Sequence, residues 1–200
     1  MAFEQLKQKF EENGFKVSVF STGAEAADYL AGCVKGMNVG LGGSMTLKEM
    51  GVEERLRANN TVFWHWNSTA DPNESLRQAM TTEVYLLSAN AIAEDTAEIL
   101  NIDGTGNRVS SSLFGHKKVY FVAGKNKISP DYEHALWRLR NVVAPKNAQR
   151  LGRKTPCAAN ADKCYDCNSP ERICNALVVF YKKIRSMDME VILIDEELGY

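Results

Sequence analysis

Val39-Gly40-Leu41-Gly42-Gly43-Ser44-Met45-Thr46 indicates the class of this protein more firmly than any other part of its 200 residues. The apolar segment 37–41 predicts a short strand, and residues 45–50 predict a helix that ends at Gly51. A glycine-rich loop joins the two. The order strand, glycine-rich loop, helix is typical of α/β proteins that bind a ligand at this junction.

The glycine-rich loop predicts a binding site for an anion. Gly40, Gly42 and Gly43 allow positive φ and carry no Cβ, so consecutive backbone N–H groups can converge on a phosphate or carboxylate. Ser44 is placed to cap the following helix, whose first turn contains Thr46. The spacing is not the G-x-G-x-x-G of dinucleotide-binding proteins and the P-loop lysine is absent, so the loop supports no nucleotide cofactor. A tight strand-to-helix turn without a ligand is the alternative.

Predicted strands and helices alternate on both sides of this loop. Before it, residues 3–10 predict a helix, residues 15–20 a strand, and Thr22-Gly-Ala-Glu25 a capping box that starts a second helix. After it come predicted strands at 61–66, 83–88, 118–123, 178–180 and 191–194, with helices at 52–58, from Asp71 onward and at 130–143. This alternation predicts one domain over residues 1–200, an α/β fold with a Rossmann-like, mainly parallel sheet and helices on both faces.

The composition argues against several classes of function. The formal net charge is −1, which does not suggest a nucleic-acid-binding protein. No apolar run approaches the ~18 residues of a membrane span, and the N-terminal residues do not resemble a signal peptide. We therefore expect a cytoplasmic protein. From Lys146 to Arg185, nine Lys or Arg residues stand against three Asp or Glu, which predicts a basic face for a small anionic metabolite.

Polar residues after the predicted strand 83–88 are candidates for a site at its carboxyl end, namely Asn90, Glu94, Asp95, Asp103, Asn107 and Arg108. One of the carboxylates Glu94, Asp95 and Asp103 would act as general base or nucleophile. Arg108 would hold a carboxylate or phosphate, and Lys125 or Lys127 would reach the same crevice from the end of the strand 118–123. The alternative is a solvated turn at residues 103–107. His65, between two tryptophans, is expected to be structural.

Four cysteines occur within eighteen residues, as Cys157-x6-Cys164-x2-Cys167-x6-Cys174. The central C-x-x-C pair can hold one ion, and the two outer cysteines can complete a tetrahedral thiolate set. This spacing predicts a cysteine-rich loop, residues 155–175, that binds Zn²⁺ or an iron–sulfur cluster. Reduced thiols without a metal are the alternative.

Several runs carry a resemblance to a known family. Residues 39–51, 90–95, 102–108, 122–127, 138–145 and 164–174 together resemble the LUD (lactate utilisation) domain, formerly a domain of unknown function. The resemblance covers nearly the whole chain in order. It implies a fold similar to the sugar-phosphate isomerase and CoA-transferase group.

The resemblance also implies a part in oxidising lactate to pyruvate, together with other lactate-utilisation proteins in an iron–sulfur system. This chain departs from the larger members, because it has one four-cysteine set and no ferredoxin-like pair of motifs. A second hypothesis therefore stays open: an enzyme or binding module for a phosphorylated or CoA-linked metabolite, with a structural metal. A homo-oligomer is compatible with either hypothesis.

Overall fold

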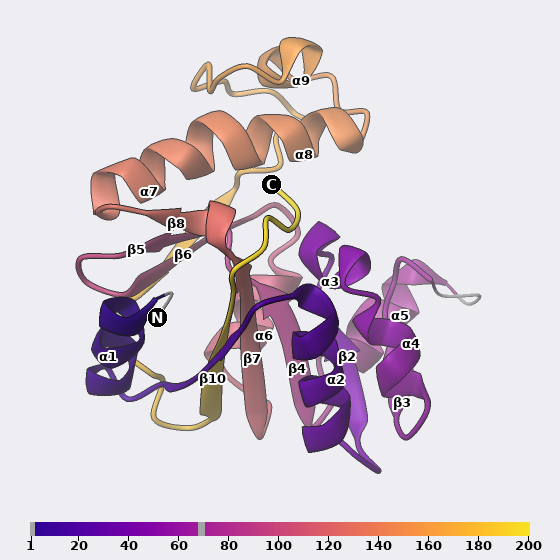
Figure 1. Ribbon diagram of the computed structural model, residues 1–200. Coiled ribbons are helices and arrows are strands. Elements are labelled where there is room, and N and C mark those ends of the chain that lie inside the picture. Colours follow the sequence, from indigo (N-terminus) through magenta and orange to yellow (C-terminus); the bar gives the residue numbers. More distant parts are fainter. Residues whose placement is uncertain (1–2, 68–70) are drawn as a thin grey trace.

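The computed structural model in Figure 1 describes residues 3–67 and 71–200. Within these residues the main sheet has six strands in the order β1-β10-β7-β4-β2-β3, and all neighbours run parallel. The strands are β1 Lys16–Phe20, β2 Asn38–Leu41, β3 Thr61–Phe63, β4 Val84–Ser88, β7 Lys118–Gly124 and β10 Asp188–Ile194. The predicted α/β class and mainly parallel sheet are confirmed.

The central strands are apolar on both sides because both faces of the main sheet are covered. In β7, Val119 and Phe121 point into one hydrophobic core, whereas Tyr120 and Val122 point into the other. All four side chains are at most 1% exposed. Strands buried on both faces read as continuous apolar runs, which is why 118–123 is recognisable from sequence.

One face of the main sheet is covered by the helices α2 Gly23–Cys33, α3 Met45–Glu49 and α4 Val52–Arg57 (Figure 1). The predicted capping box at the start of α2 is confirmed, since the Thr22 hydroxyl accepts from the backbone N–H of Glu25 and the Glu25 carboxylate accepts from that of Thr22. The other face is covered partly by α1 Glu4–Glu12 and α5 Pro72–Ala79. The helix α6 Asn107–Leu113 follows the polar segment.

The rest of that face is covered by a second sheet, which the sequence did not predict. In the described chain its order is β8-β5-β6-β9, with β5 Ala91–Ala93, β6 Glu98–Asp103, β8 Ile128–Ser129 and β9 Ala176–Phe180. The segment expected to be a polar loop is therefore largely an antiparallel β5–β6 hairpin, and the predicted strand 178–180 belongs to this sheet. Burial of Ile92, Ile99 and Phe180 against the main sheet stabilises it.

A long helical segment crosses the carboxyl edge of the main sheet, at the top of Figure 1. It comprises α7 Tyr132–Arg138, the π-helical turn η2 Leu139–Val143 and α8 Ala144–Arg150. The prediction ended this helix at Val143. The helix continues past Pro145. Proline lacks an N–H and its ring needs space, and the wide turn η2 directly before it accommodates both. The short helices η1 Lys125–Lys127 and α9 Pro156–Asn160 complete the described elements.

No helix in the described ranges is both long enough and apolar enough to span a bilayer.

Candidate anion-binding cavity

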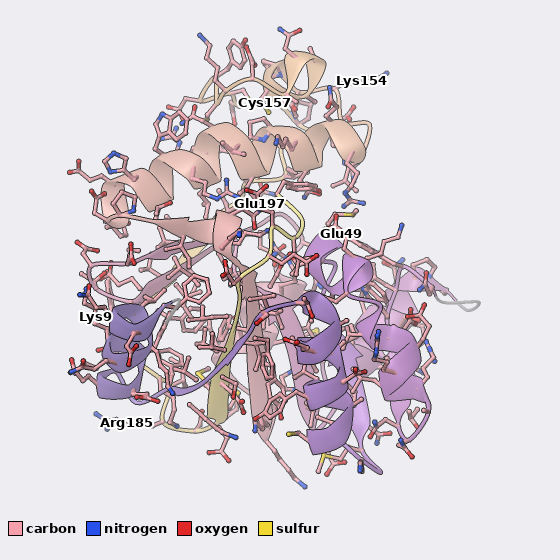
Figure 2. All side chains as sticks on the ribbon, viewed as in Figure 1. Lys9, Glu49, Lys154, Cys157, Arg185 and Glu197 are labelled. Atoms are coloured by element: carbon pink, nitrogen blue, oxygen red, sulfur yellow. The ribbon has the colours of Figure 1, made fainter. Side chains whose placement is uncertain are left out.

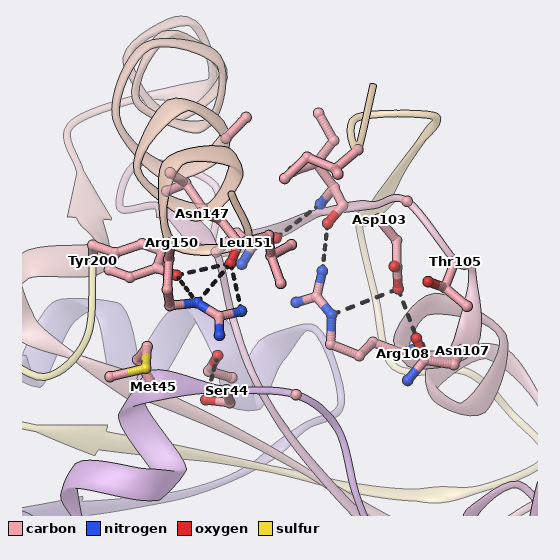
Figure 3. Close-up of a pocket in the computed structure, with 18 of the residues that line it drawn as sticks. Ser44, Met45, Asp103, Thr105, Asn107, Arg108, Asn147, Arg150, Leu151 and Tyr200 are labelled. Carbon is pink, nitrogen blue, oxygen red and sulfur yellow. Dashed lines mark hydrogen bonds and ion pairs between the residues drawn. The ribbon is translucent and has the colours of Figure 1, made fainter. Parts of the chain in front are cut away.

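A cavity of about 380 Å³ lies at the carboxyl ends of the parallel strands (Figure 3). Ser88 ends β4, Gly43 follows β2, Trp66 follows β3, and Lys127 follows β7, and all four line the cavity. Ligands of open parallel sheets bind at this edge, because the loops after the strands converge there. The main sheet thus brings together residues that are far apart in the sequence.

The opposite wall comes from the C-terminal part of the chain. Asn147 and Arg150 of α8 line it, as does Tyr200, which follows β10. The segment Pro170–Ile173, between Cys167 and Cys174, lines it as well. The cysteine-rich loop is therefore part of the cavity wall through residues other than its cysteines.

The cavity is predominantly basic. Among the described residues that line it, five are Lys or Arg and two are Asp or Glu: Arg108, Lys127, Arg150, Arg153 and Arg172 against Asp103 and Glu171. Three of the arginines come from the stretch 146–185 for which the sequence predicted a basic face. A concave surface with an excess of one charge concentrates field lines and attracts the opposite charge.

Asp103 and Arg108 form a fixed pair at one side of the cavity (Figure 3). One oxygen of the Asp103 carboxylate accepts from the backbone N–H groups of Arg108, at 3.0 Å, and Val109, at 3.2 Å, and so caps α6. The same oxygen lies 3.6 Å from Nε of Arg108, and the guanidinium also donates to the carbonyl of Ile102. The Arg108 side chain is only 12% exposed. Asp103 therefore positions the arginine.

A second cationic group is held by aromatic and amide side chains. Arg150 donates to Oδ1 of Asn147 at 2.8 Å and to the Tyr200 hydroxyl at 2.9 Å. Its guanidinium carbon lies 4.7 Å from the centre of the Trp66 ring, and Trp66 stacks on Trp64. These contacts hold Arg150 at the cavity wall although its side chain is exposed.

His65 was expected to be structural, but its side chain also lines the cavity. Burial lowers the pKa of His65, and the charge of Arg150 lowers it further. Nδ1 of His65 is buried without a hydrogen-bond partner among the described residues. The neutral imidazole is therefore favoured over the imidazolium at this position.

Lys127 is the most buried cation of the cavity, at 2% exposure. Its Nζ donates to the main-chain oxygen of Tyr200, the last residue of the sequence, at 2.6 Å. Burial lowers the pKa of Lys127 to about 7, and the nearby charges of Arg138 and Arg108 act in the same direction. Lys125, two residues earlier, is exposed and pairs with Asp195 at 3.1 Å. Of the two lysines that the sequence placed near the crevice, only Lys127 reaches it.

The sequence as a whole matches a family model, the LUD domain, over residues 3–194. The chain belongs to the LUD domain family. Membership suggests, in general terms, a role in lactate utilisation. No curated protein matches this sequence.

The structure of this LUD domain is similar to the crystal structure of a DUF162 family protein from Deinococcus radiodurans, DUF162 being the former name of the family. The two share 13% sequence identity with a TM-score of 0.54, over 96% of this chain and 95% of that chain. At this identity the likeness shows the fold alone.

The glycine-rich loop of this LUD domain does not form the predicted nest of N–H groups. None of Gly40, Gly42 and Gly43 is among the described glycines with positive φ. The N–H of Gly42 donates to the Leu86 carbonyl at 2.9 Å, so it is not free for an anion. Ser44 caps α3 as predicted, accepting from Leu47 N–H at 3.1 Å, but α3 spans only five residues.

Close packing explains the glycines instead. A Cβ on Gly40 would lie 2.5 Å from the Ala79 carbonyl oxygen. On Gly42 it would lie 2.9 Å from Cγ of Arg108, and on Gly43 3.1 Å from Nε1 of Trp66. Gly42 and Gly43 therefore leave space for side chains of the cavity.

The remaining predicted residues divide between the cavity and the surface. Asn90 and Asn107 line the cavity, and Asn90 also accepts from the Ile102 N–H at 2.9 Å. Thr46 lines it and donates to the Leu198 carbonyl at 3.1 Å. Glu94 and Asp95 lie at the exposed turn of the β5–β6 hairpin and are not among the residues that line the cavity. Glu94 and Asp95 were candidates because this segment was expected to be a polar loop, whereas it contains the strands β5 and β6.

The four cysteines of the loop are half-buried free thiols. Figure 2 shows Cys157 in the loop above the long helix. Nε of Arg172 lies 3.1 Å from Sγ of Cys174, and Arg140 lies 3.6 Å from Sγ of Cys164. Across the described ranges no group of three or more His, Cys, Asp or Glu side chains is placed to hold a metal ion. As arranged here, the cysteines do not fit the predicted metal.

Gly42→Ala is expected to displace Arg108, because the new Cβ would lie 2.9 Å from its Cγ. Binding of an anion to the cavity should weaken by about 5-fold, the effect of one impaired hydrogen bond. Gly32→Ala is the matched control, since its Cβ would meet no atom within 4 Å. Titration calorimetry with pyruvate measures both. Equal affinities for the two variants would show that Arg108 does not need the space above Gly42.

Proposed function

We propose that this LUD domain binds a small anionic metabolite in the cavity and serves the oxidation of lactate to pyruvate together with partner proteins. The observation that carries the proposal is the excess of basic side chains in a cavity at the carboxyl ends of the parallel strands. Family membership supplies the metabolic context. The metabolite is a 2-hydroxy acid or the corresponding 2-oxo acid.

The side chains of the cavity suit the carboxylate of such an acid. A guanidinium presents paired N–H donors that match the two oxygens of a carboxylate, and Arg108 is held in place by Asp103 and Ile102. The hydroxyl or carbonyl oxygen of the acid needs a neutral partner. Ser88, Asn107 and His65 also line the cavity and supply donors and acceptors.

The size of the cavity favours a second candidate. A volume of about 380 Å³ corresponds to roughly a dozen non-hydrogen atoms at the packing of liquid water, about twice the size of lactate. A small phosphorylated metabolite, or one end of a CoA-linked metabolite, would fill it more completely and would use more of its basic side chains. In this second candidate function the cavity also binds an anion, but the ligand is larger.

Calorimetric titration of the full chain separates the two candidates. The probes are lactate, pyruvate, inorganic phosphate, a sugar phosphate and coenzyme A. Saturable binding of lactate or pyruvate supports the first candidate. Binding of only the phosphate compounds supports the second, and binding of none of the five contradicts both.

Affinity for an anion is expected to fall as pH rises through the pKa of Lys127, which is about 7. Below that pH the ammonium is charged and attracts the anion, and above it the amine is neutral. From about pH 6.5 to about 8.5 the affinity should fall by ~10-fold. The groups that face Lys127 are Arg138, Arg108, Glu49 and the main-chain oxygen of Tyr200.

Titration calorimetry across this range checks the pH dependence. Lys127→Met should remove it, because no group replaces the titrating amine. Lys125→Met should keep it, since Lys125 is exposed and outside the cavity. If the wild type showed a flat profile, Lys127 would not contribute its charge to binding.

The metal predicted for the four cysteines has no step in this proposal. It stays a separate prediction that concerns residues 155–175. Metal analysis of protein purified without oxygen tests it: stoichiometric iron or zinc would establish the site. Metal-free protein with four titratable thiols in that loop would contradict it.

A further inference from the structure

Two arginines line the cavity from opposite walls. Arg108 lies in the first turn of α6, and Arg150 is the last residue of α8. Figure 3 shows their guanidinium groups on opposite sides of the cavity, with Ser44 below. A guanidinium is the side chain best suited to hold a carboxylate, because its N–H groups match the two oxygens. The cavity therefore has two separate points at which an anionic group can bind.

The partners of Arg150 are all neutral. Its Nε donates to the Tyr200 hydroxyl at 2.9 Å and its Nη2 to Oδ1 of Asn147 at 2.8 Å, and the Tyr200 hydroxyl donates to the same Oδ1. The ring of Trp66 covers one face of the guanidinium. No Asp or Glu carboxylate of the described residues pairs with Arg150. The guanidinium is thus held in place while its charge is left without a counter-ion.

Both guanidinium groups keep one nitrogen for a ligand. In Arg108, Nε pairs with Asp103 and Nη2 donates to the Ile102 carbonyl. Within the described ranges, Nη1 has no hydrogen-bond or ion-pair partner in either Arg108 or Arg150. Each arginine is therefore fixed through two of its nitrogens and unused at the third.

The other cations of the cavity are less suited to hold a ligand carboxylate. Lys127 donates to the main-chain oxygen of Tyr200, and Arg172 donates to two main-chain carbonyls of the cysteine-rich loop. The side chain of Arg153 has no hydrogen-bond or ion-pair partner in the described part of the chain, so nothing fixes it. Arg108 and Arg150 are the cations that are both held in place and unused at one nitrogen.

We infer that the ligand of the cavity is a dicarboxylic 2-oxo or 2-hydroxy acid, held at one end by Arg108 and at the other by Arg150. This inference rests on the first candidate of the proposed function and specifies its substrate class. The carboxylate next to the oxo or hydroxyl group binds Arg108, and the second carboxylate supplies the missing counter-ion of Arg150. Lactate or pyruvate has one carboxylate and would leave one of the two arginines unpaired.

The size of the cavity agrees with such a ligand. A dicarboxylic 2-oxo acid of five carbons has about ten non-hydrogen atoms, close to the roughly one dozen that the cavity can hold at the packing of liquid water. The same ligand also carries two negative charges into a cavity whose described lining has more cations than carboxylates.

Titration calorimetry of the full chain with two matched ligands tests the inference. 2-Oxoglutarate and 2-oxopentanoate have the same carbon chain and the same 2-oxo acid group, and differ in whether the far end is a carboxylate or a methyl group. We expect 2-oxoglutarate to bind about 10- to 100-fold more tightly, the effect of one charge-assisted contact. Inorganic phosphate carries its charge in one group and should bind more weakly than 2-oxoglutarate.

Two variants show which residue gives this preference. Arg150→Met should bind the two acids with affinities within about 2-fold of each other, because the partner of the second carboxylate is gone. The side chain of Arg150 is exposed, so the variant keeps its fold. Lys146→Met is the matched control: Lys146 is an exposed cation on the same helix, outside the cavity, and its loss should leave the preference unchanged.

The outcomes separate this inference from the proposed function. If the wild type binds both acids equally well, or if Arg150→Met keeps the preference, the inference is wrong and the binding of a 2-oxo acid stands. Phosphate bound as tightly as 2-oxoglutarate would also overturn it, since total charge would then decide affinity. If neither acid binds, the inference and the first candidate function both fail.

Discussion

Replacing Arg108 by methionine is expected to weaken the binding of pyruvate or another anionic metabolite by about 10- to 100-fold. A charge-assisted hydrogen bond is worth about 1.5–3 kcal/mol, and Arg108 is largely shielded from solvent. Methionine retains the aliphatic part of the side chain that packs against Gly42. The change therefore removes the guanidinium while the cavity keeps its shape. Titration calorimetry on both proteins measures the loss.

The matched control is Arg77→Met. Arg77 lies on α5, pairs only with Glu74 at 3.2 Å among the described residues, and is 71% exposed. This variant loses the same charge from the whole protein without touching the cavity. Equal losses in the two variants would mean that net charge, and not the position of Arg108, determines binding.

Glu190→Ala is expected to lower the free energy of unfolding by about 3 kcal/mol, the largest stability effect we predict for a single side chain outside the apolar cores. Glu190 on β10 is 0% exposed. Its carboxylate accepts from the Tyr29 hydroxyl at 2.7 Å, from Ser18 at 2.8 Å and from Lys118 at 3.0 Å. Alanine leaves these donors without their acceptor. Chemical denaturation measures the change.

Glu83→Ala provides the comparison, because Glu83 also pairs with a lysine, Lys117, but at an exposed position. Exposed pairs are screened by solvent, so this variant should be nearly as stable as the wild type. If Glu190→Ala were equally mild, the carboxylate would not hold the first, seventh and tenth strands together as its contacts indicate.

The Glu190 contribution should also depend on pH. Burial raises the pKa of this carboxyl, but the hydrogen bonds from Tyr29, Lys118 and Ser18 outweigh burial and hold the pKa below its ordinary value of 4.5. The folded state therefore favours the charged form. The stabilisation is present above pH 4.5 and is lost as pH falls below it, so Glu190→Ala should be less acid-sensitive than the wild type.

The main sheet was predictable from sequence because its strands are apolar runs or alternate apolar with polar residues, and because predicted helices lie between them. Residues 119–123 are an uninterrupted apolar run, and the capping box at Thr22 marks a helix start. The β5–β6 hairpin was missed because β5 is three residues long and consists of two alanines around Ile92. Its burial depends on packing against the main sheet, which no local pattern shows.

Site residues could be predicted from the sequence where a polar or charged residue follows the end of a predicted strand. Ser44, Asp103 and Arg108 follow from that rule and line the cavity. Arg150 and Tyr200 do not, because they come from a helix and a C-terminal segment whose approach to the sheet is set by tertiary packing. What distinguishes Lys127 from Lys125 is the side of the turn η1 on which each lies. Lys127 lies on the side that faces the interior, and Lys125 lies on the side that faces solvent.

The position of a bound anion tests the central claim most directly. A crystal structure of the protein with pyruvate, at a concentration that saturates binding in calorimetry, would give that position. We predict density in the cavity, with the pyruvate carboxylate within hydrogen-bond distance of the Arg108 guanidinium. Pyruvate bound only outside this cavity, with water between Arg108 and Lys127, would contradict the account.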